Sequence, residues 1–331
     1  MKILFINSQN TGDYVNDYMN DLLLHGLRQL SDNEVIDYPG AWYLYKDESK
    51  KRNLEKNSFW GKGFSTSNIL DDFNSVDRTD ILSKIKNKYF DLVIYGSIRR
   101  NNEFFDDIIK YNNNCVVVDG EDDQYIDKEY SNRCLYFKRE LDQTIPNIEP
   151  ISFAVPKEKI LKNITTDFEF LLAPLIPGKL NTYNYDDESS YYNMYKKSVF
   201  ALTYKKIGWD CLRHYEILMN GCIPLFINLN DCPKRTMETL PKEKLLGIYR
   251  DYHQILSYYN PFQIYKKKFL SLNKFVSFFS NFLRNKNLES YMNKNLGLID
   301  LKNELLTYTK NNLTTENLAK YVINKTFNKK N

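Results

Sequence analysis

Between residues 205 and 220, a basic loop runs into a stretch whose charged side chains recur at helical spacing. Lys205, Lys206 and Gly208 belong to the loop, and Asp210 is a residue type that often caps the N-terminus of a helix. The amides and the dipole at a helix N-terminus favour an anion, and basic side chains add charge-assisted hydrogen bonds to phosphate oxygens. This segment therefore indicates the binding of a phosphate or a diphosphate.

The helix expected over residues 210–220 has two faces. The apolar face, which should pack on a sheet, consists of Cys211, Tyr215, Leu218 and Met219. Asp210, Arg213, Glu216 and Asn220 lie on the other face, which in most helices is simply solvated. Here Arg213 can reach a diphosphate, and Glu216 lies about 9 Å along the axis from the helix start. That offset suits a ribose, whose two hydroxyls a carboxylate can bind, so a nucleoside diphosphate fits better than a bare anion.

Strands are expected on both sides of this helix, because residues 199–203 and 223–227 are apolar runs. Gly221 stands where a left-handed residue should end the helix. Earlier in the chain, strands are expected at 2–6, 34–38, 91–95 and 115–118 and helices at 18–30, 81–88 and 104–111. The alternation predicts an α/β fold with open parallel sheets, whose ligands gather beyond the carboxyl ends of the strands.

An acidic turn, residues 119–123, follows one of these strands. One interpretation is a solvated turn that caps the next segment. The other is that one of its carboxylates accepts a proton from a substrate hydroxyl, which requires it to face a cleft. No G-x-G-x-x-G motif follows the first strand, so a standard nicotinamide-binding half is disfavoured.

Two stretches look irregular. Residues 46–75 are polar around the Gly-Lys-Gly-Phe sequence at 61–64, and an ordinary surface excursion is the simpler interpretation, with a lid or acceptor-side loop as the alternative. Pro146, Pro150 and Pro156 indicate a connection between domains. A length of 331 residues is consistent with two domains.

The run G-W-D-C-L-R-H-Y-E-I-L-M-N-G-C-I-P at residues 208–224 resembles the donor-site signature of GT-B glycosyltransferases. The similarity is to exostosin-like and related bacterial, phage and giant-virus members, and it rests on Arg213, Glu216, Gly221, Ile223 and Pro224. Weaker similarities lie at residues 17–39, 119–122, 137–141 and 191–206, so the resemblance reaches about residue 245. It implies two Rossmann-like domains facing a cleft, an acceptor-side domain over 1–150 and a donor domain with a helical tail over 151–331.

The resemblance also implies roles for the site residues. Glu216 would bind the ribose of a nucleotide-diphosphate sugar, and Arg213 with Lys205 and Lys206 would hold the diphosphate and stabilise the leaving group, beside Gly208 and Asp210. Such enzymes generally need no bound metal or other cofactor, and the terminal helices of this fold commonly cross back to the first domain.

Three further assignments stay open at this stage. Lys138 and Arg139 could reach the diphosphate from across the cleft, although a surface ion pair with Glu140 is a competing account. A general base, needed if the enzyme inverts, is expected in the turn that contains Asp119, Glu121 and Asp122, with Asp13 as another candidate. His25 and His214 are interpreted as partly buried structural residues.

Composition narrows the alternatives. Lys and Arg (46) nearly balance Asp and Glu (42), so a nucleic-acid partner is not indicated. The five cysteines include no C-x-x-C pair, which argues against a disulfide framework, and with only three histidines a metal site is not expected. The N-terminal apolar run is too short for a signal peptide, which favours a cytoplasmic protein. A basic, apolar stretch at 266–284 suggests core packing or a peripheral membrane contact. The rival functions are a DNA-base glycosyltransferase of the same fold and a catalytically silent nucleotide-binding or scaffold module.

Overall fold

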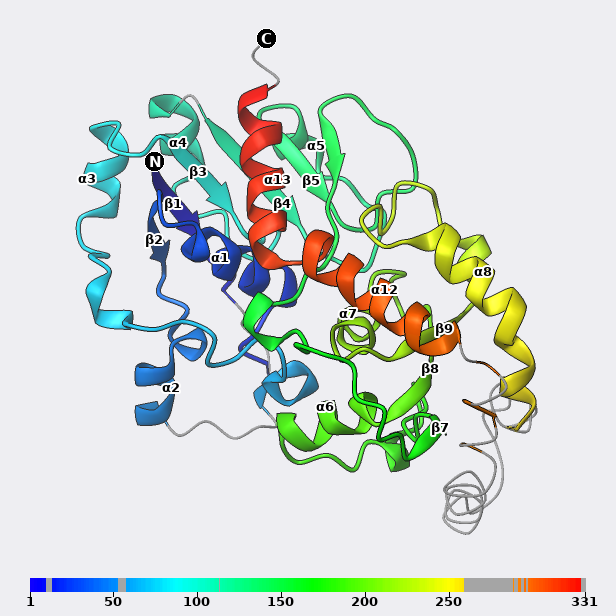
Figure 1. Cartoon of the computed structure of the whole chain (residues 1–331). Coiled ribbons are helices and arrows are strands. Elements are labelled where there is room, and N and C mark those ends of the chain that lie inside the picture. The colour runs from blue at the N-terminus through cyan, green and yellow to red at the C-terminus, as the bar shows by residue number, and fades with distance from the viewer. Residues whose placement is uncertain are drawn as a thin grey trace.

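The computed structural model describes residues 1–9, 14–52, 58–112, 114–258, 288, 291–292, 295 and 297–328. The expected stretch at 266–284 lies outside these residues, as does Asp13. The architecture is α/β, with two parallel sheets and helices around them (Figure 1). The predicted fold class is confirmed at this level.

The first sheet has six parallel strands in the order β2-β1-β3-β4-β5-β6. Its strands are β1 (Lys2–Ile6), β2 (Glu34–Tyr38), β3 (Leu92–Tyr95), β4 (Cys115–Asp119), β5 (Leu135–Lys138) and β6 (Ile148–Pro150). The helices of this half are α1 (Tyr18–Gln29), α2 (Lys46–Arg52), α3 (Ile81–Lys86), α4 (Phe105–Tyr111) and α5 (Lys128–Ser131). The alternating strands and helices predicted for this region are confirmed.

Both faces of the first sheet are buried, which is why its strands are continuous apolar runs. Ile3 and Phe5 of β1 belong to an apolar cluster that includes α1, whereas Leu4 and Ile6 belong to a second cluster that includes α3 and α4. This division follows from the alternation of side chains along a strand. The cluster on the α1 side continues into the second half of the chain, so the two halves share a core.

The second sheet is smaller and lies at the lower right of Figure 1. Its three parallel strands, in the order β7-β8-β9, are β7 (Phe170–Leu172), β8 (Ser198–Tyr204) and β9 (Ile223–Ile227). The helices of this half are α6 (Glu188–Lys196), α7 (Leu212–Met219), α8 (Lys242–Tyr252), α12 (Gly297–Asn312) and α13 (Thr315–Asn328). None of the helices in the described part of the chain is long and apolar enough to cross a membrane.

The ends of two helices differ from the sequence-based expectation. Helix α7 begins one residue later than predicted, with Cys211 instead of Asp210 at its N-cap, because both carboxylate oxygens of Asp210 accept hydrogen bonds elsewhere. Its C-terminal end agrees with the prediction, since Gly221 has a φ of +66°. For the last helix, the sequence predicts residues 316–324 with Thr315 as the N-cap. Helix α13 is instead capped by Thr314, whose Oγ1 accepts from the amide of Asn317.

Helix α13 crosses back to the first sheet and packs along α1, as the red and dark blue helices of Figure 1 show. The two helices approach closely at Gly26, where any Cβ would overlap the carbonyl of Thr315. A hydrogen bond of 2.8 Å joins His25 Nδ1 to Thr315 Oγ1, and Tyr321 donates to the carbonyl of Pro150. The last helix is therefore part of the packing of the first half.

Replacing Gly26 by alanine is expected to lower the free energy of unfolding by about 3 kcal/mol or more, because the new methyl group forces the backbone of α13 away from α1. Gly297→Ala is the matched control, since Gly297 is also a helical glycine but a Cβ added there meets no described residue within 4 Å. Urea denaturation of both variants measures the difference. Equal stability of the two variants would contradict the close packing of α13 on α1.

Candidate functional site

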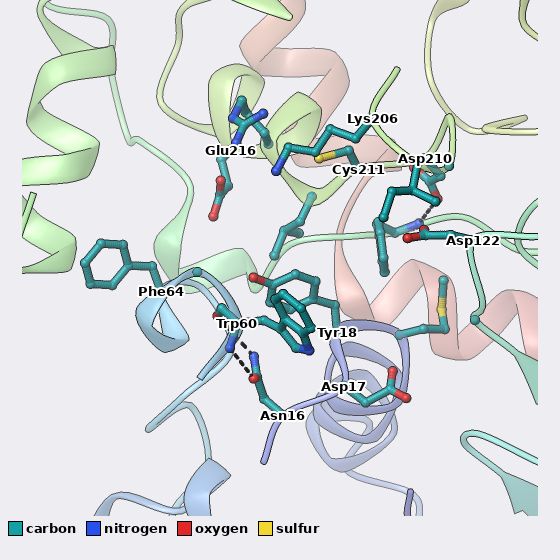
Figure 2. A pocket seen from close by; sticks show the side chains of 18 of the residues that line it. Asn16, Asp17, Tyr18, Trp60, Phe64, Asp122, Lys206, Asp210, Cys211 and Glu216 are labelled. Carbon is teal, nitrogen blue, oxygen red and sulfur yellow. Dashed lines mark hydrogen bonds between the residues drawn. The ribbon is translucent and has the colours of Figure 1, made fainter. Parts of the chain in front are cut away.

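A pocket of about 530 Å³ lies between the two halves of the chain, beyond the carboxyl ends of the strands (Figure 2). One wall comes from the start of α1, the segment around Trp60 and the turn after β4; the other comes from the loop after β8 and from α7. Figure 2 shows Tyr18 and Trp60 on one side and Lys206, Cys211 and Glu216 on the other. This is the edge at which open α/β sheets bind ligands.

Arg213 gives the clearest indication that the pocket binds a ligand. It is 7% exposed, and its Nη2 donates to the hydroxyl of Tyr183 at 2.8 Å. Its Nε and Nη1 are buried at the pocket, and neither has a hydrogen-bond partner among the residues that the structure describes. Because an arginine stays charged in a protein and an unsatisfied buried donor is costly, these two nitrogens indicate an acceptor of negative charge.

Lys206 lies on the same wall as Arg213. Lys206 is exposed at the pocket, but partial desolvation lowers its pKa. The positive charge of Arg213 lowers it further, which means that the two cations lie close enough to repel each other. Among the described residues, no carboxylate forms an ion pair with either of them. An anion bound between Lys206 and Arg213 would remove this repulsion.

Glu216 also lines the pocket, but it is not on a solvated face. Its Oε1 accepts from Ser65 Oγ and its Oε2 from the hydroxyl of Tyr191, each at 2.7 Å. Burial raises the pKa of Glu216, although these two hydrogen bonds work in the opposite direction. Every residue of α7 is buried, so the simple interpretation of its charged face as solvated is wrong.

The cover over Glu216 comes from residues 60–65, which we call the strap. Ser65 has a left-handed φ of +69°, and its amide donates to Glu188 at 2.7 Å. Lys62, also left-handed, donates to the carbonyl of Tyr185 at 2.6 Å and pairs with Asp186. The strap therefore ties the first half to the segment 185–188 and forms part of the pocket wall, so residues 46–75 are more than a surface excursion.

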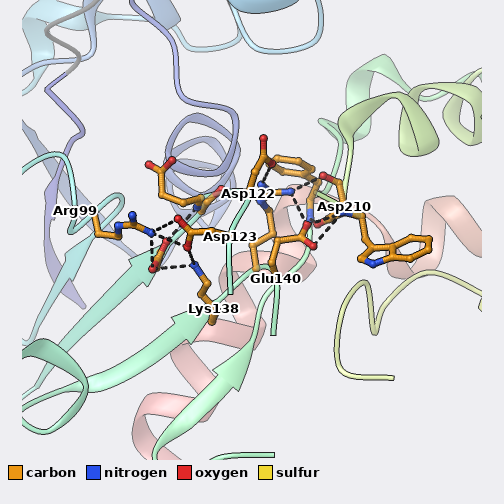
Figure 3. Close-up of polar contacts among 12 residues, drawn as sticks. Arg99, Asp122, Asp123, Lys138, Glu140 and Asp210 are labelled. Carbon is orange, nitrogen blue, oxygen red and sulfur yellow. Dashed lines mark hydrogen bonds and ion pairs between the residues drawn. The ribbon is translucent and has the colours of Figure 1, made fainter. Parts of the chain in front are cut away.

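The carboxylates of the turn after β4 are all held in ion pairs. Figure 3 shows those of Asp122 and Asp123. Asp119 is buried, 3.0 Å from Lys138 Nζ, and accepts from the hydroxyl of Tyr136. The sequence predicts Asp119 as a candidate general base and Lys138 as a candidate ligand of the diphosphate, but neither residue lines the pocket. Lys138 does not line the pocket because neighbouring side chains along an extended chain point to opposite sides. Since Arg139 faces the pocket, Lys138 faces away from it.

Glu121 and Asp122 do line the pocket. Glu121 accepts from Arg100 Nε at 2.7 Å, and this hydrogen bond, with the positive charge behind it, outweighs burial and lowers the pKa of the carboxyl. Asp122 forms an ion pair with Arg139. A carboxylate with a lowered pKa is a weaker base. Glu121 is therefore a weaker candidate for the general base than the sequence alone indicates.

Arg139 and Glu140 join the two halves beside the pocket (Figure 3). Glu140 accepts from the backbone amides of Trp209 and Asp210 at 3.0 and 2.9 Å, and Arg139 donates to the carbonyl of Asp210. The alternative prediction for Arg139 is a surface ion pair with Glu140. This ion pair is present, but it is buried. Gly208 packs against Glu140, leaving no space there for a side chain.

Asp210 is expected to make the stability of the protein depend on pH. Burial raises its pKa from 3.8 to about 7, so between these values the folded protein keeps a proton that the unfolded chain has released. Its contribution to the free energy of unfolding therefore falls as the pH rises, by on the order of 1 kcal/mol per unit.

The variant Asp210→Asn isolates this effect, because the amide keeps an acceptor for the amide of Phe153 and can donate to Tyr215. Urea denaturation from pH 4.5 to pH 7.5 measures both proteins. We expect the stability of wild type relative to the variant to decline across this range. A constant difference would show that Asp210 does not titrate there.

Some predicted residues lie elsewhere, and other residues of the pocket were not foreseen. Lys205 is exposed and lies over the ring of Trp209 at 5.0 Å instead of lining the pocket. His25 and His214 are fully rather than partly buried. The pocket also holds Asp17, whose pKa is raised by burial, and Arg100, together with a set of aromatic side chains: Tyr18, Trp60, Phe64, Tyr183, Tyr185 and Tyr191.

Comparison of the chain with protein-family models found no match, and a search of curated proteins found none either. Among the residues that the structure describes, no group of three or more His, Cys, Asp or Glu side chains is arranged to hold a metal ion. The interpretation of the site therefore rests on its geometry and charge.

Proposed function

We propose that the protein is a glycosyltransferase that moves a sugar from a nucleotide-diphosphate sugar to a hydroxyl group of a glycan or other acceptor. Two parallel sheets with a pocket between them are compatible with the GT-B architecture, in which residues 1–150 would face the acceptor and residues 151–331 the donor. The observation that carries the proposal is Arg213, a buried cation of which two nitrogens at the pocket have no hydrogen-bond partner in the described part of the chain.

In this proposal the diphosphate of the donor lies against Arg213, Lys206 and the N-terminus of α7, which is eight residues long. Glu216, further along the same helix, binds the ribose hydroxyls. We expect a bare anion to be a poorer ligand, because the carboxylate of Glu216 in the same pocket would repel it. The positive side chains supply the charge that a divalent cation would otherwise provide, so we expect no metal requirement.

During transfer, the acceptor oxygen forms a bond to the anomeric carbon of the sugar while the bond from that carbon to the β-phosphate oxygen breaks. The nucleoside diphosphate leaves with the electron pair, and Arg213 and Lys206 stabilise its developing charge. The proton of the acceptor hydroxyl passes to a carboxylate of the opposite wall. Asp17, Glu121 and Asp122 line that wall, and burial raises the pKa of Asp17, which favours it as the base.

A panel of UDP-, GDP-, ADP- and CMP-sugars tests the proposal by thermal shift and by acceptor-free release of sugar. A diphosphate sugar is expected to raise the melting temperature and to be hydrolysed slowly, since binding to the folded state alone stabilises it by mass action. CMP-sugars, which carry one phosphate, should give a smaller shift. Binding without hydrolysis or transfer would indicate a silent nucleotide-binding module, and the absence of any shift would refute the donor site.

A further inference from the structure

Trp60 is unusual among the large apolar side chains of this protein. It is 50% exposed and lines the pocket, on the wall opposite Lys206 in Figure 2. One face of its ring stacks on Tyr14, with the ring centroids 3.8 Å apart and an interplanar angle of 24°. An aromatic ring that is covered on one face and half exposed presents its other face to a ligand.

The position of Trp60 is fixed before any ligand binds. Asn16, which is fully buried, accepts from the amide of Trp60 at 2.7 Å and donates to its carbonyl at 3.3 Å, as the dashed lines of Figure 2 show. These hydrogen bonds fix the backbone of Trp60, and the stack on Tyr14 restrains its ring. The side chain therefore loses little conformational entropy on binding, which favours affinity.

The charges around Trp60 point to the class of ligand. Arg100 is paired with Glu121 and Asp17, and Lys62 is paired with Asp186. The positive charges of this wall are therefore balanced by carboxylates, in contrast to Lys206 and Arg213 on the other wall. A phosphate-rich ligand such as a nucleic acid would gain little here. A neutral, polyhydroxylated ligand matches the site, because its hydroxyls can bond to carboxylates and guanidinium groups while its C–H face lies on the ring.

We propose that Trp60, held by Asn16 and backed by Tyr14, is the stacking platform for a pyranose ring of the acceptor, and that the acceptor is a neutral glycan. This inference rests on the proposed glycosyltransferase function, because it takes the opposite wall as the donor side. It names the acceptor class and a residue that selects it.

The first test is the fluorescence of the full-length protein during titration with methyl glucoside, methyl galactoside, lactose, maltose and chitobiose. The chain has three tryptophans, of which Trp42 lies outside the pocket lining and Trp209 is buried. We expect at least one saccharide to change the fluorescence of wild type and of Trp42→Phe, and the change to disappear in Trp60→Leu. A panel without any change, or a change that persists in Trp60→Leu, would overturn the platform.

The second test separates this inference from the proposed function. For a saccharide that stimulates release of nucleotide from the donor, Trp60→Leu is expected to raise the acceptor KM about 10-fold or more, and Trp60→Phe to raise it less. The KM for the nucleotide sugar should change much less than the acceptor KM in both variants. An unchanged KM contradicts the platform while leaving the donor site intact. If wild type hydrolyses no nucleotide sugar, the proposed function fails. The fluorescence titration then still shows whether Trp60 binds saccharides. An oligothymidine is the control ligand, and a fluorescence change with it instead of with a saccharide would contradict the platform.

Discussion

Replacing Arg213 by alanine is expected to weaken the binding of a nucleoside diphosphate at least about 100-fold. Its Nε and Nη1 would each donate a charge-assisted hydrogen bond to phosphate oxygens, and such a bond contributes about 1.5–3 kcal/mol. Isothermal titration with UDP, GDP and ADP measures the loss. The melting temperature of the unliganded variant should change little, because the guanidinium makes a single hydrogen bond, to Tyr183, among the described residues.

Two further variants make this result specific. Arg213→Lys keeps the charge but not the planar set of donors, so its affinity should lie between those of wild type and alanine. Arg250→Ala removes an exposed arginine of α8, which pairs with Asp251 outside the pocket, and should bind like wild type. If Arg213→Ala retained full affinity, Arg213 would be a structural charge and the proposed diphosphate site would be lost.

The second large effect concerns Glu216 and the sugar of the nucleotide. Wild type is expected to bind a 2′-deoxynucleoside diphosphate about 10-fold more weakly than the ribonucleotide, because one hydrogen bond to the carboxylate is lost. Glu216→Gln should bind the ribonucleotide about 10-fold more weakly than wild type and should discriminate little between the two ligands. Titration of both proteins with both ligands gives the coupling between the carboxylate and the hydroxyl.

This comparison also controls for structural damage. Glu216→Gln disturbs an acceptor of Ser65 and Tyr191, which can lower stability, but a general loss of structure would weaken both ligands equally. Glu188→Gln is the matched control, because Glu188 also accepts from Ser65 but does not line the pocket. It should keep the discrimination of wild type. Equal discrimination in Glu216→Gln and wild type would rule out a contact between Glu216 and the ribose.

Six of the nine described strands are predicted from the sequence, whereas no strand is predicted at β5, β6 or β7. Strands β1, β2 and β9 begin and end at the predicted residues, since a buried parallel strand is a continuous apolar run between polar loops. The helix ends are less predictable. A helix N-terminus depends on which side chain caps it, and Asp210 is engaged by Phe153 and Tyr215 instead.

For the site, part of what the prediction missed was available in the sequence. Lys138 and Arg139 are neighbours at the end of a strand, and Lys205 and Lys206 are neighbours in the loop after β8. Side chains that follow one another in extended chain point in opposite directions, so only one member of each pair should reach the pocket. The structure places Arg139 and Lys206 there.

The surroundings of Glu216 were not predictable in the same way. The hydroxyl that covers its Oε1 belongs to Ser65, which lies 151 residues earlier in the chain. Nothing in the helical pattern around Glu216 shows that a distant segment folds over it, because that contact depends on how the two halves meet. The same limit applies to Trp60, whose exposure and support by Asn16 are properties of the assembled pocket.

The contact between α1 and α13 has a consequence for how the protein is made. Helix α1 ends at Gln29, whereas the helix that packs along it begins at Thr315. At ordinary rates of translation, about 5–20 residues per second, the ribosome needs about 15–60 s to synthesise the chain between them. For that time one side of α1 has no native cover. A premature stop codon anywhere before residue 315 therefore leaves the first half incompletely packed, even when every strand of both sheets has been translated.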